Sequence, residues 1–363
     1  MVTSADIKSE IANRTSPARR SLAGRLAALL LGLSLLLLLS AVAAAGLGAV
    51  HIPPGELLRS FLGRLSGGAS AGGADQILWD LRLPRIALGA VVGAALSVAG
   101  ASLQGLLLNP LADPYLIGVS AGAAFGAALA VLTGVAGFAG GMGRTLAGFA
   151  AAVLTLLIVY RLAYRNGRIG RESFILAGVV VGSFMWALVT LVMALASGGQ
   201  LAGVISWLLG NLGQSLSGLS IGLGGGLMLA AMLALYAFSR DLNLLALGEE
   251  PAKQLGVEVE RLKKLVILLA ALLTAASVAV SGVIGFVGLI IPHMARRLWG
   301  PDHRLLLPAS ALLGACFLVW ADTLARVVIA PSELPVGVIT SLLGAPFFCY
   351  LLVSSAHRSR EDS

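Results

Sequence analysis

The sequence predicts an all-α membrane protein, a polytopic transmembrane helical bundle with about ten spans per subunit. Hydrophobic residues make up 58% of the 363 residues and charged residues only 12%, whereas a soluble domain carries about 25% charged residues. The mean hydropathy is +0.94. The apolar residues gather in runs that approach or exceed the roughly 20 residues needed to cross the membrane. These three observations exclude a disordered chain, a coiled coil and a water-soluble enzyme.

The transmembrane domain is expected to cover residues 24–353, between an N-terminal tail of residues 1–23 and a C-terminal tail of residues 354–363. The eighth apolar run is short and contains Pro292 and His293, so we expect a broken or tilted helix buried by its neighbours. The ten apolar runs fall near residues 24–50, 86–108, 116–134, 145–164, 173–197, 219–239, 265–281, 283–298, 305–330 and 334–353.

The first run also resembles a signal peptide, because basic residues precede it and Ala43–Ala45 stand before Gly46. Its apolar stretch is longer than the usual 7–15 residues of a signal peptide. The sequence therefore favours an uncleaved first span over a cleaved leader.

The basic residues predict the orientation. With ten spans and a cytoplasmic N-terminus, 19 of the 25 lysines and arginines fall on the inside and 6 on the outside. Positive charges concentrate on the side of the membrane that is not translocated. Both termini are therefore expected to be cytoplasmic. The net charge of +8 is explained by topology, and no soluble basic patch suggests a nucleic-acid partner.

Small residues and cysteines inside the runs are expected to pack. Gly118, Gly122 and Gly126 recur every four residues, and such spacing lets helix backbones approach closely in a membrane. Cys316 and Cys349 both lie in apolar runs and are interpreted as small core residues. No metal-ligand spacing is present, so we expect neither a metal site nor a cofactor.

The chain lacks the elements that would power transport by itself. No GxxxxGK[ST] stretch occurs, so the chain cannot bind a nucleotide through a P-loop. Ion-coupled transporters usually place ionisable residues at mid-membrane, and here Asp322 is the main one. Asp322 precedes Arg326 by four residues, which predicts an ion pair within one helix. The energy for transport is therefore expected to come from a partner, with a stand-alone ion-coupled transporter as the alternative and a membrane enzyme or receptor as a further one.

Residues 240–264 are too polar to span and too patterned for a simple linker. Glu249 and Glu250 precede Lys253, and Pro251 suits the first turn of a helix. One or two short helices on the cytoplasmic surface are predicted, either as a docking surface for a soluble motor subunit or as an interfacial helix on lipid. The apolar side is expected to consist of Leu245, Leu247, Ala252, Leu255 and Val257.

The sequence resembles the FecCD family, the permease subunits of type II ABC importers, which include permeases for vitamin B12, haem and iron siderophores. The resemblance covers about residues 80–350. It is carried by RLPR at 82–85, GAALSVAGASLQGLLLNPLADPYLIGVSAGA at 93–123, LALGEEPAKQLGV at 245–257, GVIGFVGLIIPHMAR at 282–296, DHRLLLPASALLGA at 302–315, ADTLAR at 321–326 and ELPVGVITSLLGAPFF at 333–348.

The resemblance implies a type II importer permease in the bacterial inner membrane. It implies a homodimer with a central pathway, two cytoplasmic ATP-binding cassette subunits that hydrolyse ATP, and an extracytoplasmic substrate-binding protein. The chain itself would not be an enzyme. A ferric siderophore or haem is favoured as the cargo, with cobalamin as the other option.

The resemblance also implies roles for particular residues. Arg82, Arg85 and Arg326 would face outward and pair with acidic residues of the binding protein. The turn Asn109–Pro110–Leu111 would form the cytoplasmic gate. The family's second gate stretch is usually small and hydroxyl-bearing, whereas residues 171–173 here read Arg-Glu-Ser. The residues that would contact the ATPase subunit are Gly248, Glu249, Glu250, Pro251, Ala252 and Gly256.

Overall fold

The computed structural model describes residues 21–65, 73–165, 167–213 and 218–361, and each of the ten predicted runs forms a helix in it. The helices are α2 (Leu22–Gly46), α5 (Leu83–Leu107), α6 (Val119–Leu132), α7 (Phe138–Ala163), α8 (Arg171–Leu195), α10 (Gly218–Ala237), α13 (Val259–Ser281), α14 (Val287–Trp299), α15 (His303–Val327) and α16 (Val336–Glu361).

Short elements join these helices. The connections hold α3 (Pro54–Leu65), α4 (Gly73–Gln76), the π-helix η1 (Ile77–Arg82), the 3-10 helices η2 (Pro114–Ile117) and η3 (Val135–Gly137), α9 (Gly198–Leu208), α11 (Ser239–Leu245), α12 (Glu249–Gln254), and the hairpin of β1 (Tyr164–Arg165) with β2 (Arg168–Ile169). Helices α3 and α9 were not predicted, because both lie between the predicted apolar runs.

Within the described residues, six helices are long and apolar enough to span a membrane, or up to seven when the bent pair of α10 and α11 counts as one span. That pair is bent by 49°. Among the other predicted runs, α6 has 14 residues and α14 has 13. As expected, α14 is short, contains Pro292 and is buried along its first half. Short helices of this kind are tolerated at membrane depth where neighbouring helices cover their ends.

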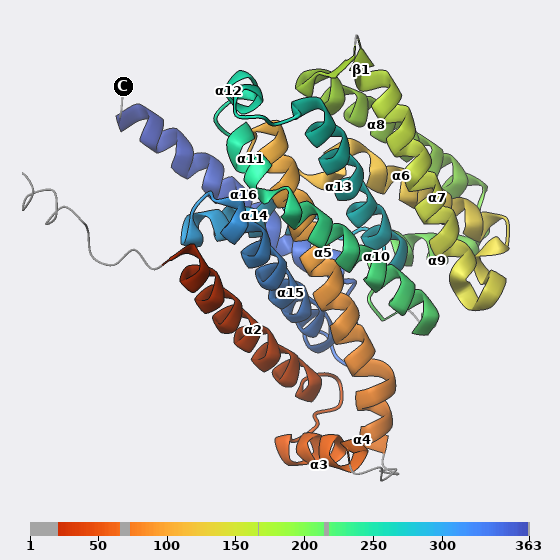
Figure 1. Cartoon of the computed structure of the whole chain (residues 1–363). Coiled ribbons are helices and arrows are strands. Elements are labelled where there is room, and N and C mark those ends of the chain that lie inside the picture. The colour runs from red at the N-terminus through yellow and green to blue at the C-terminus, as the bar shows by residue number, and fades with distance from the viewer. Residues whose placement is uncertain (1–20, 66–72, 166, 214–217, 362–363) are drawn as a thin grey trace, which may run out of the picture.

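Helix α5 lies at the centre of the bundle (Figure 1) and packs against α15, α13, α14 and α10. Helix α2 packs on α15 and leaves most of its leucines exposed. Helices α6, α7 and α8 pack on one another, and α13 joins that group to α5. Exposed leucines are expected where a helix faces lipid tails, which are themselves apolar.

Glycines allow α5 to approach its neighbours. A Cβ placed on Gly93 would lie 2.2 Å from the carbonyl oxygen of Gly314 in α15, and one on Gly100 would lie 1.8 Å from that of Gly288 in α14. The predicted spacing of Gly118, Gly122 and Gly126 also corresponds to close contacts, against α8 for Gly118 and against α7 for the other two. The interpretation of these glycines as packing residues is confirmed.

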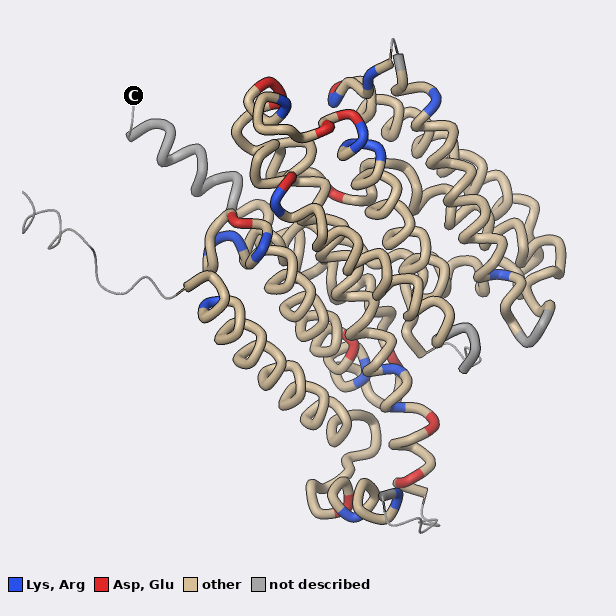
Figure 2. The backbone as a smooth tube through the Cα atoms, in the orientation of Figure 1, with Lys and Arg blue, Asp and Glu red and all other residues tan. Residues whose placement is uncertain are grey.

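Charged residues gather toward two ends of the molecule, and the band between them holds few (Figure 2). One end carries α12 and the β1–β2 hairpin, and the other carries α3 and α4 (Figure 1). We refer to them as the α12 end and the α3 end. Such a separation is typical of a protein whose middle lies in hydrocarbon.

We predict that Gly100→Ala destabilises the protein, because its Cβ would collide with the backbone of α14. Overpacking of this kind costs about 1–3 kcal/mol, and thermal unfolding in detergent would measure it. Gly32→Ala on α2 is the matched control, since a Cβ there meets nothing within 4 Å. Equal unfolding temperatures for the two variants would contradict the tight contact of α5 with α14.

Candidate functional site

Three arginines and two carboxylates meet at the α3 end and form one ion cluster. Arg85, in the first turn of α5, binds Asp322 Oδ1 through Nε at 2.8 Å and Glu333 Oε2 through Nη1 at 2.7 Å. Arg326 Nε contacts Asp322 Oδ2 at 3.1 Å, one helical turn further along α15. The predicted ion pair of Asp322 with Arg326 is therefore confirmed, and Asp322 bridges two arginines.

The remaining arginine of this cluster, Arg82, is held by backbone oxygens. It stands at the end of η1 and donates to the carbonyl of Ala45 at 2.6 Å and to that of Val50. Arg326 donates to the carbonyl of Leu47 at 3.1 Å. Together the two guanidinium groups hold the segment that leads from α2 to α3. Among the residues that the structure describes, no carboxylate pairs with Arg82, so three positive charges face two negative ones.

A cavity of about 380 Å³ opens beside this cluster and is lined by Arg82, Arg85, Arg326 and Glu333, with Gly48 and Gly213 among the other lining residues. The structure thus brings together the three arginines that the sequence analysis selected. Arg82 and Arg326 are only 6% and 5% exposed. Their guanidinium groups therefore reach solvent through this cavity and do not project from the surface.

The α12 end contains the polar segment 240–264. Its first part forms two short helices, α11 and α12, as predicted, whereas residues 259–264 belong to α13. Gly248 and Gly256 flank α12 with φ of +115° and +88°, values that side chains with a Cβ rarely adopt. The predicted apolar side is partly wrong. Leu245, Ala252 and Val257 are buried, whereas the other two predicted members are more than half exposed, because the chain reverses at each end of α12.

Glu249 joins α12 to two other elements. Its carboxylate contacts Lys263 Nζ in α13 at 2.9 Å and Arg171 Nη2 at the start of α8 at 3.2 Å. Burial alone would raise the pKa of Glu249, but the hydrogen bond from Lys263 and the charges of Lys263, Arg171 and Lys253 lower the pKa below its usual value. Arg171, in the segment 171–173 that departs from the expected gate composition, is thus ion-paired with α12. Arg171 and Glu249 are far apart in the sequence, and no sequence pattern indicated that they would be in contact.

The predicted gate turn follows α5 at the α12 end. Leu108 takes a left-handed conformation with φ of +48°, and Asn109 Oδ1 accepts the N–H of Leu111 at 2.9 Å. Leu111 is 42% exposed at the tip of the turn. Further along, the hydroxyl of Tyr115 donates to the carbonyl of Ile284 at 2.7 Å and accepts its N–H at 2.9 Å. Helix η2, which follows the turn, is therefore connected to the loop between α13 and α14.

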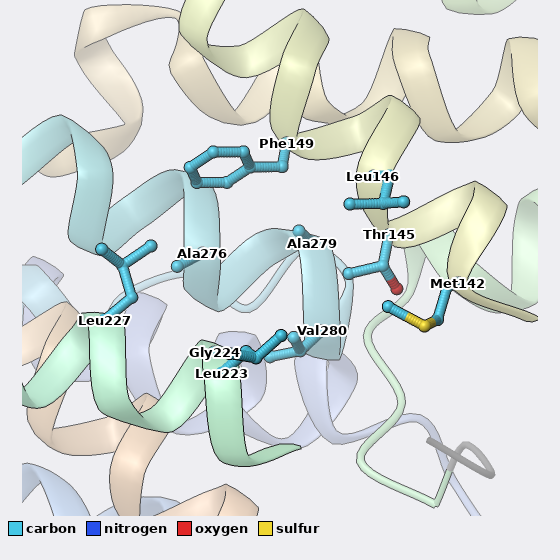
Figure 3. A pocket seen from close by; sticks show the side chains of 10 residues that line it. All are labelled: Met142, Thr145, Leu146, Phe149, Leu223, Gly224, Leu227, Ala276, Ala279 and Val280. Atoms are coloured by element: carbon cyan, nitrogen blue, oxygen red, sulfur yellow. The ribbon is translucent and has the colours of Figure 1, made fainter. Parts of the chain in front are cut away.

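An apolar pocket of about 150 Å³ lies between α7, α10 and α13 (Figure 3). Phe149, Leu227 and Ala276 are among its lining residues, and Thr145 supplies the one hydroxyl group among the labelled side chains. Such a lining offers little to orient a polar ligand. Within the described ranges, no group of three or more His, Cys, Asp or Glu side chains is placed to hold a metal ion.

Comparison with solved structures supports the fold. The chain matches the structure of a metal-chelate type ABC transporter in an inward-facing conformation with a TM-score of 0.76 and 33% identity. The match covers 90% of this chain and 98% of the other.

Two curated relatives cover most of the chain. It is 45% identical over 281 residues to the cobalamin import system permease protein BtuC of Halobacterium salinarum, which is 77% of this chain and 74% of the relative. It is 39% identical over 339 residues to the hemin transport system permease protein HmuU of Yersinia pestis, which is 92% of this chain and 97% of the relative. The model of the FecCD transport family matches residues 35–354. The chain therefore belongs to the FecCD transport family.

Proposed function

We propose that this chain is the membrane-spanning subunit of an ABC importer that carries a metal chelate into the cytoplasm. The observation that supports this most strongly is its similarity, over nine-tenths of its length, to a permease of a hemin transport system. The sequence contains no P-loop, so a separate ATP-binding cassette subunit must hydrolyse ATP. Two copies of the chain would form the pathway between them.

The two charged ends suit different partners. The excess of basic residues in the segments at the α12 end favours a cytoplasmic location for that end. The ATPase subunits would then dock on α12, where exposed Leu247 and Leu255 flank the charged helix. The binding protein would dock at the α3 end, and an acidic side chain of that protein would balance the excess positive charge of Arg82, Arg85 and Arg326.

Transport would proceed by alternating access. An ATPase dimer that binds one conformation of the permease more tightly than the other shifts the equilibrium between them. Movement of α12 would open or close the turn at Asn109–Leu111, while the α3 end responds in the opposite sense. The pairing of Asp322 with two arginines also argues against the ion-coupled alternative, since its carboxylate is already neutralised.

The cargo class is a metal chelate. Cobalamin and hemin are named for the two relatives, and the motif resemblance adds ferric siderophores to this class. All three are large complexes of a metal ion that the binding protein would select before docking.

The function is tested by transport in lipid vesicles that contain the permease, its ATPase subunits and its binding protein. We expect ATP-dependent uptake of one of three offered cargoes, cobalamin, haem or a ferric siderophore. The permease alone should hydrolyse no ATP. Uptake by the permease alone, driven by a proton or sodium gradient, would refute the proposal in favour of a secondary transporter.

For docking, we predict that Arg82→Gln weakens binding of the binding protein by about tenfold, equivalent to about 1.4 kcal/mol. The substitution removes the charge that lacks a carboxylate partner and leaves one NH2 group, on a shorter side chain, in place of the two nitrogens that bind the carbonyls of Ala45 and Val50. Surface plasmon resonance with the permease in nanodiscs would measure the affinity of the binding protein. Arg59→Gln, an exposed arginine of α3 at the same end, is the control. Equal affinities of the wild type and Arg82→Gln would contradict the docking role.

For coupling, we predict that replacing residues 249–253 by a Gly/Ser sequence abolishes ATP-driven uptake. The permease should still insert, because α12 buries only Ala252 and Lys263 keeps Glu260 as a carboxylate partner when Glu249 is replaced. Uptake and fluorescence-detected size exclusion would be measured side by side. Arg261→Ser, which removes an exposed ion pair with Glu258 at the start of α13, serves as the control. Normal uptake by the Gly/Ser variant would exclude α12 as the docking element.

A further inference from the structure

Lys263 is a buried ammonium group at the α12 end. Its side chain is 6% exposed, although it stands near the start of α13 at the border of the bundle. Its Nζ has three acceptors, namely Glu249 Oε2 at 2.9 Å, Glu260 Oε1 at 3.0 Å and the carbonyl of Ile169 at 3.5 Å. An ammonium group has three N–H donors, so each donor has a partner.

The partners of Lys263 come from three separate parts of the chain. Glu249 belongs to α12 and also binds Arg171 of α8 at 3.2 Å. Glu260 belongs to α13 and accepts the N–H of Ile169 through Oε2 at 3.1 Å. Ile169 belongs to β2 of the hairpin that precedes α8. One buried charge therefore connects α12 with α13 and with the hairpin at the start of α8.

The connection has an energetic consequence because the group is buried. Removal of one partner from a buried ion pair leaves an uncompensated charge, which is strongly unfavourable. Movement of α12 away from Lys263 would remove one of its two carboxylate partners and leave Glu260 alone to balance the buried charge. Helix α12 and Lys263 are therefore expected to move together, carrying α13 and the hairpin with them. An exposed pair such as Glu250 with Lys253, which lies within α12, imposes no such constraint.

Two of the helices connected through Lys263 and Glu249, namely α8 and α13, reach the gate region. Helix α8 and helix α13 each pack against η2, the 3-10 helix that directly follows the gate turn at residues 109–111. At that contact a Cβ on Gly178 of α8 would lie 2.3 Å from the carbonyl oxygen of Leu116. There is thus little room for α8 to shift without displacing η2.

We propose that Lys263 is a positioning residue for coupling, which locks α12 to α13 and to the hairpin before α8 so that a force on α12 displaces both helices against η2. The inference rests on the proposed function, since an ATPase subunit must supply that force. It adds a specific residue inside the permease, away from the contact surface with the ATPase, and it assigns a role to Arg171 as the second point of attachment on α8.

The test uses the complete transporter in vesicles and measures cargo taken up per ATP hydrolysed. Coupling energies between sites usually correspond to 5- to 150-fold, and we expect Lys263→Met to lower this ratio by about tenfold. ATPase subunits should remain bound and active, because the exposed surface of α12 is unchanged. Lys263→Arg keeps the positive charge, so it should take up more cargo per ATP hydrolysed than Lys263→Met. Arg168→Met, an exposed arginine on the same hairpin, should leave the ratio unchanged.

A second variant keeps the inference testable if Lys263→Met does not fold. Glu249→Gln preserves the size of the side chain and one acceptor oxygen but removes the charge that Lys263 and Arg171 share. It should lower the same ratio, and in combination with a folded Lys263→Met its effect should be less than additive, because both variants break one connection.

The outcomes separate the inference from the proposed function. A wild-type complex without ATP-dependent uptake would overturn both. A wild type that transports normally, together with an unchanged ratio in Lys263→Met or in Glu249→Gln, would overturn the role of Lys263 alone. A loss of ATPase binding in Lys263→Met would also overturn it, since Lys263 would then shape the docking surface and not the transmission behind it.

Discussion

The close contact of α5 with α14 and α15 is the constraint on which the rest of the bundle depends. In a membrane, helices gain little from the hydrophobic effect when they associate, because lipid tails are as apolar as their side chains. Contact between backbones must then supply the packing energy. At Gly93 and Gly100 the neighbouring backbone occupies the space where a Cβ would stand. This contact positions α5 so that the α3-end cluster forms at its first turn and the gate turn follows its last.

Charge is handled differently at the two ends. At the α3 end, Arg85 and Arg326 are balanced by Asp322 and Glu333, while Arg82 is held by carbonyl groups beside an open cavity. At the α12 end, Lys263 and Glu249 connect elements that are far apart in the sequence. The first arrangement leaves positive charge for a partner. The second uses its charges to hold parts of the same chain together.

Much of the fold was predictable because hydrophobic runs of sufficient length have few alternatives in a bilayer. All ten runs are helices, and the ion pair of Asp322 with Arg326 follows from their spacing of four residues. The contact of Arg171 with Glu249 and the role of Glu333 were not predictable. Each depends on the way distant helices pack, and a single sequence contains no periodic signal for such contacts. The exposure of Leu247 and Leu255 was missed because the reversals around α12 break the helical period.

The sequence by itself determined that the chain crosses the membrane repeatedly, which residues occupy its two ends, and that it cannot bind ATP through a P-loop. These properties follow from local composition and from short motifs, whose consequences do not depend on distant residues. Only the tertiary structure decided which charges meet, that the three arginines line one cavity, and that one lysine joins α12 to α13 and the hairpin before α8. Pairing between distant side chains is set by helix packing, and packing is the property of the whole bundle.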